Sequence, residues 1–216
     1  MIDPQLGALF VSAFVTLFVV IDPPGCAPIF AGLTSGASAA QARSMAVRAC
    51  AIATGILFAF ALFGEQLLSA LHIELNSFRI AGGIMLFLIA LEMVFEKRTQ
   101  RRTERAEKVL ARNDETPKIE DVSVFPMAMP MLAGPGSIAT VMLLMSRSHG
   151  TEATLAILAA LTAVMLLSLV ALLAALPLMR LVGDQVEAVI SRLLGVLLAA
   201  LAAQYVIDGL REAMSV

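Results

Sequence analysis

Long apolar stretches separated by short polar connections make up most of the chain. A helix that crosses a bilayer core of about 30 Å needs about 20 apolar residues, and six windows meet this requirement. They are residues 6–34, 45–71, 78–95, 123–146, 153–179 and 186–207. Because the connections leave little chain for a soluble domain, the pattern predicts one all-α polytopic membrane domain over residues 1–216, with six transmembrane helices.

Charged residues gather in one segment between the third and fourth windows. Of the 15 Lys and Arg and the 17 Asp and Glu, 15 residues fall within 96–121. The composition agrees with a membrane protein, because 59% of the residues are hydrophobic and 15% are charged, against roughly 45–50% and about 25% in soluble domains. The lipid bilayer is therefore an expected partner. A net charge of −2 offers no basic surface, so nucleic acid is not expected as a partner.

Six spans place the connections on two sides of the membrane, and Lys and Arg are distributed unequally between these sides. The side that holds both termini carries Arg79, Arg147 and Arg211, and the other side carries the remaining 12 of the 15 Lys and Arg. Because positively charged loops stay in the cytoplasm, we expect both termini outside and the charged segment in the cytoplasm. We interpret that segment as a solvated linker.

Two matches relate the first three spans to the last three. Pro-Gly-Cys beginning at Pro24 corresponds to Pro-Gly-Ser beginning at Pro135, and Arg-x-x-Gly beginning at Arg79 corresponds to the same pattern at Arg192, with offsets of 111 and 113. Internal repeats of this kind are frequent in secondary transporters. Since three spans per half is an odd number, the repeats would be inverted. We expect repeat 1 over about residues 5–96, a cytoplasmic linker over about 97–121 and repeat 2 over about 122–211.

The first span is expected to break near its middle. As one helix its 29 residues would reach about 43 Å, more than a bilayer core of about 30 Å. Near the centre, Pro23, Pro24 and Pro28 remove backbone donors, and Gly25 permits dihedrals that end a helix. Helix 1 should therefore unwind at mid-membrane.

The fourth span repeats this pattern with Pro126, Pro130 and the run Gly134, Pro135, Gly136. Unwound backbone is not tolerated against lipid, because each unpaired amide costs several kcal/mol, so both breaks should face protein or a hydrated cavity. A broken helix offers N–H groups to an anion and carbonyls to a cation. Two opposed breaks would then form one binding site.

Asp22 is the only carboxylate expected deep within a span. An ionised carboxylate there costs at least a few kcal/mol, so it must be compensated or protonated. Three roles are open. Asp22 would pair with a substrate ammonium group, exchange protons through a pKa raised by burial, or only cap the second half-helix by accepting from the amides after the break.

Other polar residues give weaker signals. Ser137 and Thr140 follow the second break, where a hydroxyl would cap the helix or contact a ligand. Glu92 lies near the cytoplasmic end of its span, which favours a solvated or gating position over a proton relay. Arg79 and Arg192 begin spans on opposite sides and are interpreted as snorkelling anchors. Three glycines are expected to allow close helix packing: Gly82, Gly83 and Gly195.

No catalytic or metal site is expected, and no cofactor. Cys26 and Cys50 lack metal-ligand spacing, and His72 and His149 are solitary. No nucleophile–base pair or second intramembrane acid is evident, and the G-x-x-x-x-G-K-[ST] motif of ATP-binding segments is absent from the sequence. An enzyme is therefore not predicted.

The two breaks resemble two signatures of the MarC family of bacterial inner-membrane proteins. Residues 22–30, DPPGCAPIF, look like D-P-x-G-x-x-P-x-F, and residues 125–140, FPMAMPMLAGPGSIAT, look like P-x-A-x-P-x-L-A-G-P-G-x-I-A. The resemblance covers essentially the whole chain. This sequence has Cys26 where many members carry asparagine, an amide that would contact a ligand carboxylate.

The resemblance implies a polytopic protein of the bacterial inner (plasma) membrane, related to the lysine-exporter superfamily, in which some members are regarded as neutral amino acid transporters. We therefore expect a secondary transporter, an exporter of small zwitterionic metabolites such as neutral amino acids, with protons or another ion as the coupling partner where transport is coupled. Alternating access would rock one repeat against the other. The alternatives are a channel-like passive facilitator and a non-transporting integral membrane protein.

The expected site lies at mid-membrane between the two broken helices. The half-helix after Pro135 and Gly136 would hold the substrate carboxylate with help from Ser137, and Asp22 with nearby freed carbonyls would hold the ammonium or a coupling proton. The predicted substrate-binding residues are Asp22, Pro23, Gly25, Cys26, Pro28, Pro130, Gly134, Pro135, Gly136, Ser137 and Thr140.

Overall fold

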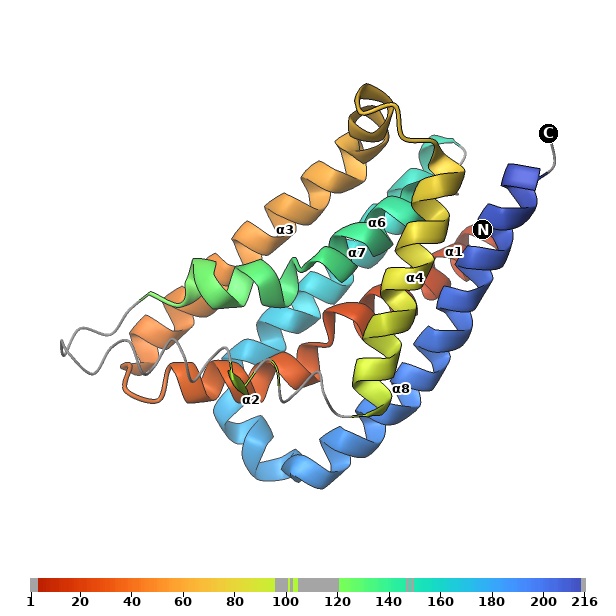
Figure 1. Cartoon of the computed structure of the whole chain (residues 1–216). Coiled ribbons are helices and arrows are strands. Elements are labelled where there is room, and N and C mark those ends of the chain that lie inside the picture. The colour runs from red at the N-terminus through yellow and green to blue at the C-terminus, as the bar shows by residue number, and fades with distance from the viewer. Residues whose placement is uncertain are drawn as a thin grey trace.

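The structure is a computed structural model that describes residues 4–95, 101, 103, 104, 121–146, 148 and 150–214, and for residues 176–188 and 190 it describes the backbone alone. The predicted linker therefore lies largely outside the described residues, as do Arg147 and His149. Helices and no strands occur in the described part, which confirms the all-α prediction. The elements are α1 (Pro4–Ile21), α2 (Pro23–Leu33), α3 (Ala39–Ala70), α4 (Leu75–Val94), η1 (Ser123–Leu132), α6 (Pro135–Ser146), α7 (Thr151–Leu173) and α8 (Ala175–Met214), shown in Figure 1.

Five helices of the described chain are long and apolar enough to cross a membrane. They are Pro4–Leu33, Ala39–Ala70, Leu75–Val94, Thr151–Leu173 and Ser191–Met214. The bent pair of η1 and α6, with an angle of 50° between its members, becomes a sixth candidate when it is counted as one span. The number and order of apolar segments thus agree with the prediction.

The boundary between the last two spans differs from the prediction. Helix α7 ends at Leu173 and α8 begins at Ala175, whereas hydropathy extended the fifth span to residue 179 and began the sixth at 186. Pro177 falls in the first turn of α8, where an N–H group would have no acceptor within the helix. Since the apolar run continues across this junction, hydropathy does not reveal the change of direction.

The connections gather at two ends of the bundle. Both termini, the α3–α4 turn and the α6–α7 connection lie toward one end in Figure 1, which we call the terminal end. The α2–α3 connection, the C-terminal end of α4 and the α7–α8 junction lie toward the opposite end, which we call the linker end.

Apolar side chains cover both the inside and the outside of the bundle. A larger buried cluster joins α1, α2, α3, η1, α6 and α7, and a smaller one joins the last turn of α1 to α4, α6 and α8. The outer faces expose further large apolar residues, among them Phe63, Leu166 and Leu193, each 58% exposed or more. An apolar outer surface of this extent suits contact with lipid.

Glycines allow α4 to approach its neighbours closely, as predicted. A Cβ atom at Gly83 would lie 2.9 Å from the carbonyl oxygen of Ala202 in α8. One at Gly195 would lie 2.9 Å from the Cβ atom of Met93 in α4, and Gly82 faces α6 in the same way. The long contact between α4 and α8 visible in Figure 1 therefore depends on small residues from both helices.

Candidate functional site

The chain interrupts its first span at Asp22. Helix α1 ends at Ile21 and α2 begins at Pro23, while Asp22 has left-handed backbone angles, with φ 59° and ψ 65°. The N–H of Asp22 still donates to the carbonyl of Phe18 at 2.9 Å, and its own carbonyl accepts from the N–H of Cys26 at 3.1 Å. Asp22 thus closes the last turn of α1 and opens the first turn of α2.

The carboxylate of Asp22 folds over the start of α2. Asp22 is buried, and its Oδ1 atom accepts from the N–H of Gly25 at 3.2 Å. A Cβ atom at Gly25 would lie 2.3 Å from Asp22 Oδ2, so only glycine leaves room for this carboxylate. The capping role of Asp22 is present in the structure, and its pairing with an ammonium group or a proton stays a prediction.

The second interruption lies between η1 and α6. Phe125 and Met129 have extended rather than helical dihedrals within η1, and each precedes a proline, which disfavours the helical region for the residue before it. The Phe125–Pro126 and Met129–Pro130 peptide bonds are cis. A Cβ atom at Gly134 would lie 2.4 Å from the carbonyl oxygen of Pro130, so the turn into α6 requires glycine.

Helix α6 presents its N-terminus to a cavity of about 290 Å³. The first amide bonded within this turn is that of Ile138, which donates to the carbonyl of Gly134 at 3.0 Å. The N–H groups of Gly136 and Ser137 precede it and have no acceptor within the helix, because first-turn amides never do. These amides and the helix dipole favour a negatively charged ligand group at this edge of the cavity.

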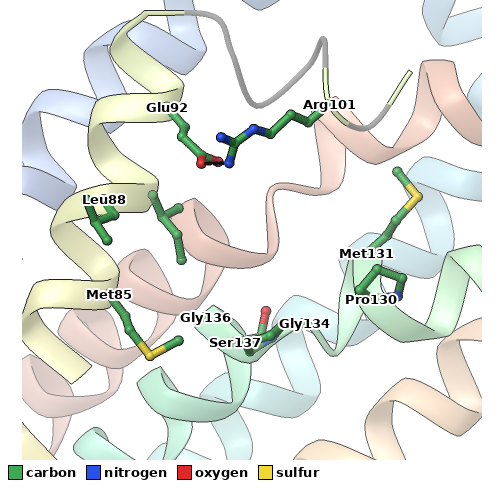
Figure 2. Close-up of a pocket in the computed structure, with 11 residues that line it drawn as sticks. Met85, Leu88, Glu92, Arg101, Pro130, Met131, Gly134, Gly136 and Ser137 are labelled. Carbon is green, nitrogen blue, oxygen red and sulfur yellow. Dashed lines mark hydrogen bonds and ion pairs between the residues drawn. The ribbon is translucent and has the colours of Figure 1, made fainter. Parts of the chain in front are cut away.

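Helix α4 and η1 form the walls of the cavity, and Arg101 completes its lining. Its residues are Met85, Leu88, Ile89, Glu92, Arg101, Pro130, Met131, Gly134, Pro135, Gly136 and Ser137. Figure 2 shows Glu92 and Arg101 together at one edge and Gly134, Gly136 and Ser137 near the opposite edge. The volume is at the lower end of the range for small-molecule sites, about 300–1,000 Å³.

Glu92 and Arg101 form an ion pair at the edge of this cavity. The Arg101 side chain is 61% exposed and that of Glu92 is 27% exposed. An ion pair so exposed contributes only about 0–1 kcal/mol, so water or a ligand can separate the two groups at little cost. Among the described residues no group of three or more His, Cys, Asp and Glu side chains could hold a metal ion.

The structure divides the predicted site residues into two groups. Those that line the cavity are Pro130, Gly134, Pro135, Gly136 and Ser137. Those that are not part of its lining are Asp22, Pro23, Gly25, Cys26, Pro28 and Thr140. Thr140 donates from its hydroxyl to the carbonyl of Gly136 at 2.7 Å, and the Cys26 thiol donates to the carbonyl of Ile21 at 3.6 Å.

The two interruptions nevertheless lie close together. A Cβ atom at Gly136 would lie 3.6 Å from Val20 Cγ1, two residues before Asp22, and 2.3 Å from Ile89 Cδ1 of α4. The start of α6 therefore packs between the end of α1 and the wall of the cavity.

The apolar residues by which α4 lines the cavity were not predicted from the sequence. Met85, Leu88, Ile89 and Glu92 recur at helical spacing on one face of α4, which places a carboxylate in line with three apolar residues. That spacing is the signal by which the wall could have been found. Arg101 lies in the charged segment, where no local pattern distinguishes it from its neighbours.

Arg79 differs from its predicted role as a snorkelling anchor. It is buried at the terminal end, where Nη2 donates to the carbonyl of Ser146 at 3.1 Å and Nε lies 3.4 Å from the Ser146 hydroxyl. It also forms an ion pair with Glu212 of α8. The carbonyl end of α6 attracts a cation, so Arg79 joins α4, α6 and α8 inside the bundle and its side chain does not extend to the outer surface.

Arg79→Gln is expected to destabilise the protein by about 1–3 kcal/mol, because charged hydrogen bonds to the end of α6 are lost. Thermal unfolding of the purified protein in detergent measures the change. Arg211→Gln is the matched control, since Arg211 is exposed on the last turns of α8. Equal melting temperatures for the two variants would contradict the assigned role of Arg79.

Comparison with known proteins agrees with this architecture. The sequence matches the MarC family of integral membrane proteins over residues 7–214. It is 33% identical over 205 residues to a UPF0056 membrane protein of Archaeoglobus fulgidus, with 95% of this chain and 93% of that protein covered. It is 32% identical over 207 residues to the UPF0056 membrane protein YvbG of Bacillus subtilis, with 96% of each covered.

A further relative is the UPF0056 inner membrane protein YhgN of Escherichia coli, which is 31% identical over 201 residues, with 93% of this chain and 95% of that protein covered. No solved structure matches the chain. The family match spans nearly all of the described helices and both interruptions, so the chain belongs to the MarC family of integral membrane proteins.

Proposed function

We propose that the protein is a secondary transporter of the bacterial inner membrane that exports small zwitterionic metabolites such as neutral amino acids. The observation that carries the proposal is the cavity at the N-terminus of α6. It combines the first-turn amides of Gly136 and Ser137 with apolar walls and with the charged pair of Glu92 and Arg101. Amides suit a substrate carboxylate, and the apolar wall suits an uncharged side chain.

Inverted repeats over about residues 5–96 and 122–211 would supply the moving parts. The helix contacts support this division when α1, α2, α3 and α4 are matched in that order with η1, α6, α7 and α8. Several contacts then have an equivalent contact between the matched helices. Helix α1 packs on α7 as η1 packs on α3, α2 packs on α7 as α6 packs on α3, and α2 packs on α8 as α6 packs on α4. The pairs α3–α7 and α4–α8 join equivalent helices, as expected for two repeats related by a pseudo-two-fold axis.

Alternating access would then open the cavity to one side of the membrane at a time. The linker end would be cytoplasmic, since 12 of the 15 Lys and Arg belong to it by the predicted topology. At the opposite end, Arg79 holds the C-terminus of α6 against α4 and α8. Separation of Glu92 from Arg101 would accompany substrate entry, and separation of Arg79 from Ser146 would accompany release.

Asp22 would serve the transport cycle as the carboxylate next to this site. When the two repeats rock against each other, the Asp22 carboxylate would leave the Gly25 amide and bind a substrate ammonium group or a proton. The proximity of Val20 to Gly136 supports this assignment, because it brings the first interruption next to the second. A carboxylate that only caps α2 would suit a channel-like facilitator or a non-transporting protein equally well, so transport by Asp22→Asn distinguishes these alternatives.

Leu88→Trp is expected to abolish ligand binding to the cavity. Leu88 lines the cavity and is 55% exposed, so a larger ring can occupy the cavity without disrupting a packed core. The measurement is the rise in melting temperature of the purified protein on adding each member of a neutral amino acid panel, since a ligand that binds only the folded state stabilises it.

Leu91→Trp is the matched control, because Leu91 is exposed on the same helix and is not part of the cavity lining. The wild type and Leu91→Trp should respond to the same amino acid, and Leu88→Trp should not. An equal rise in melting temperature for all three proteins would show that the amino acid does not bind in this cavity.

A further inference from the structure

A second and larger cavity lies at the linker end of the bundle. It has a volume of about 820 Å³ and lies between the end of α2, the first turns of α3 and the end of α7. It has no lining residue in common with the cavity of the proposed transport site. Its ligand can therefore be considered independently of transport.

Positive charge is concentrated on the α3 side of this cavity. Arg43 and Arg48 both line it, together with Ala39 and Ala40 from the first turn of α3. Arg48 pairs with Asp121, and Arg43 is exposed and forms no ion pair with any other described residue. Arg43 and the N-terminus of α3 favour an anion on this wall, and Arg48 adds further N–H donors while Asp121 balances its charge, so the three side chains carry a net charge of +1.

The remaining walls are apolar and open toward the outer surface of the bundle. Phe30 and Leu172 form a buried part of the lining, at 3% and 2% exposure. Val47 and Leu173 also line the cavity and are 45% and 43% exposed, so they continue its apolar lining onto the lipid-facing surface. A ligand that fits both surfaces has an anionic head and an apolar tail.

We propose that this cavity binds an anionic phospholipid of the membrane, with the lipid phosphate on Arg43 and Arg48 and an acyl chain on Val47 and Leu173. Helix α3 has 32 residues, about 48 Å at 1.5 Å per residue, which exceeds a bilayer core of about 30 Å, so its first turns would extend to the depth of lipid headgroups. Basic cavities between transmembrane helices bind acidic headgroups by this combination of charge and apolar contact.

The test compares lipids with the same acyl chains and different headgroups. Full-length protein purified in a neutral detergent is titrated with phosphatidylglycerol, with phosphatidylcholine or with inorganic phosphate, and bound lipid is counted by native mass spectrometry while melting temperature is recorded. Retention and stabilisation are expected with phosphatidylglycerol, and neither is expected with the other two. Equal effects of phosphatidylcholine would indicate an apolar groove only, and equal stabilisation by phosphate would indicate a site for soluble anions; either overturns the proposal.

Arg43→Gln should weaken phosphatidylglycerol binding about fivefold, the loss expected for one basic residue at a membrane surface. Arg43→Lys keeps the charge and should retain most of the affinity. Arg211→Gln, an exposed arginine at the other end of the bundle, should bind like the wild type. Unchanged binding by Arg43→Gln, or an equal loss in Arg211→Gln, would overturn the proposal.

Discussion

Gly25→Ala is expected to destabilise the protein by about 1–3 kcal/mol, the cost of inserting an atom into a filled space. The new Cβ atom would lie 2.3 Å from Asp22 Oδ2 and 2.9 Å from Asp22 Cγ. The carboxylate is buried and short, so it would have to leave the Gly25 amide and lose its place at the start of α2. Thermal unfolding in detergent, followed by circular dichroism, measures the change.

Two controls separate this clash from a general effect of alanine. Gly32 lies in the same helix with nothing within 4 Å of a Cβ atom, so Gly32→Ala should be neutral or stabilising by up to about 1 kcal/mol. The double variant Asp22→Ala, Gly25→Ala removes the clashing carboxylate and should cost less than the two single changes added together. Additive costs would contradict the proposed contact.

Gly134→Ala is expected to lower the free energy of unfolding by more than most glycine replacements in this chain. Its Cβ atom would lie 2.4 Å from the carbonyl oxygen of Pro130, a backbone atom that cannot rotate away. The turn from η1 into α6 would have to shift, which we expect to reach the upper part of the range of about 1–3 kcal/mol for overpacking. The shift would also displace Gly136 and Ser137, so ligand binding to the cavity should be lost.

Gly55→Ala in α3 is the control for Gly134→Ala, because nothing lies within 4 Å of a Cβ atom at Gly55. Melting temperature and ligand-induced stabilisation are measured for both variants. If Gly134→Ala matched Gly55→Ala in both measurements, the turn would not depend on glycine.

Much of the fold could be predicted because the bilayer acts as a solvent for the outer faces of the helices. Lipid requires apolar residues on the outside and packing requires them on the inside, so hydropathy marks nearly the whole length of each span. The same property hides the α7–α8 junction. No charge or polar run interrupts the chain near Ala175, so a change of helix direction leaves no hydropathy signal.

The candidate site was predicted in part for a similar reason. Proline and glycine change the backbone itself, so the interruptions at Asp22 and before α6 could be located from the sequence. The wall of α4 uses ordinary apolar residues such as Leu88, and these look like any membrane helix. The position of Arg79 could not be predicted, because its partners Ser146 and Glu212 reach it only through tertiary packing.

The roles left open for Asp22 can be separated by two substitutions. Asp22→Asn keeps a side-chain oxygen that can accept from the Gly25 amide but removes the negative charge, whereas Asp22→Ala removes both. If Asp22 only caps α2, the asparagine variant should resemble the wild type in stability and transport. If the carboxylate binds an ammonium group or a proton, the asparagine variant should fold and fail to transport.

Flux in proteoliposomes shows directly whether the protein transports amino acids. A panel of labelled neutral amino acids is followed with and without a pH gradient, comparing the wild type, Asp22→Asn and empty liposomes. We predict saturable flux of at least one amino acid by the wild type, accelerated by the same unlabelled amino acid on the opposite side and lost in Asp22→Asn. Absence of flux for every amino acid with correctly folded wild-type protein would contradict amino acid transport, and flux without saturation would indicate a channel-like facilitator instead.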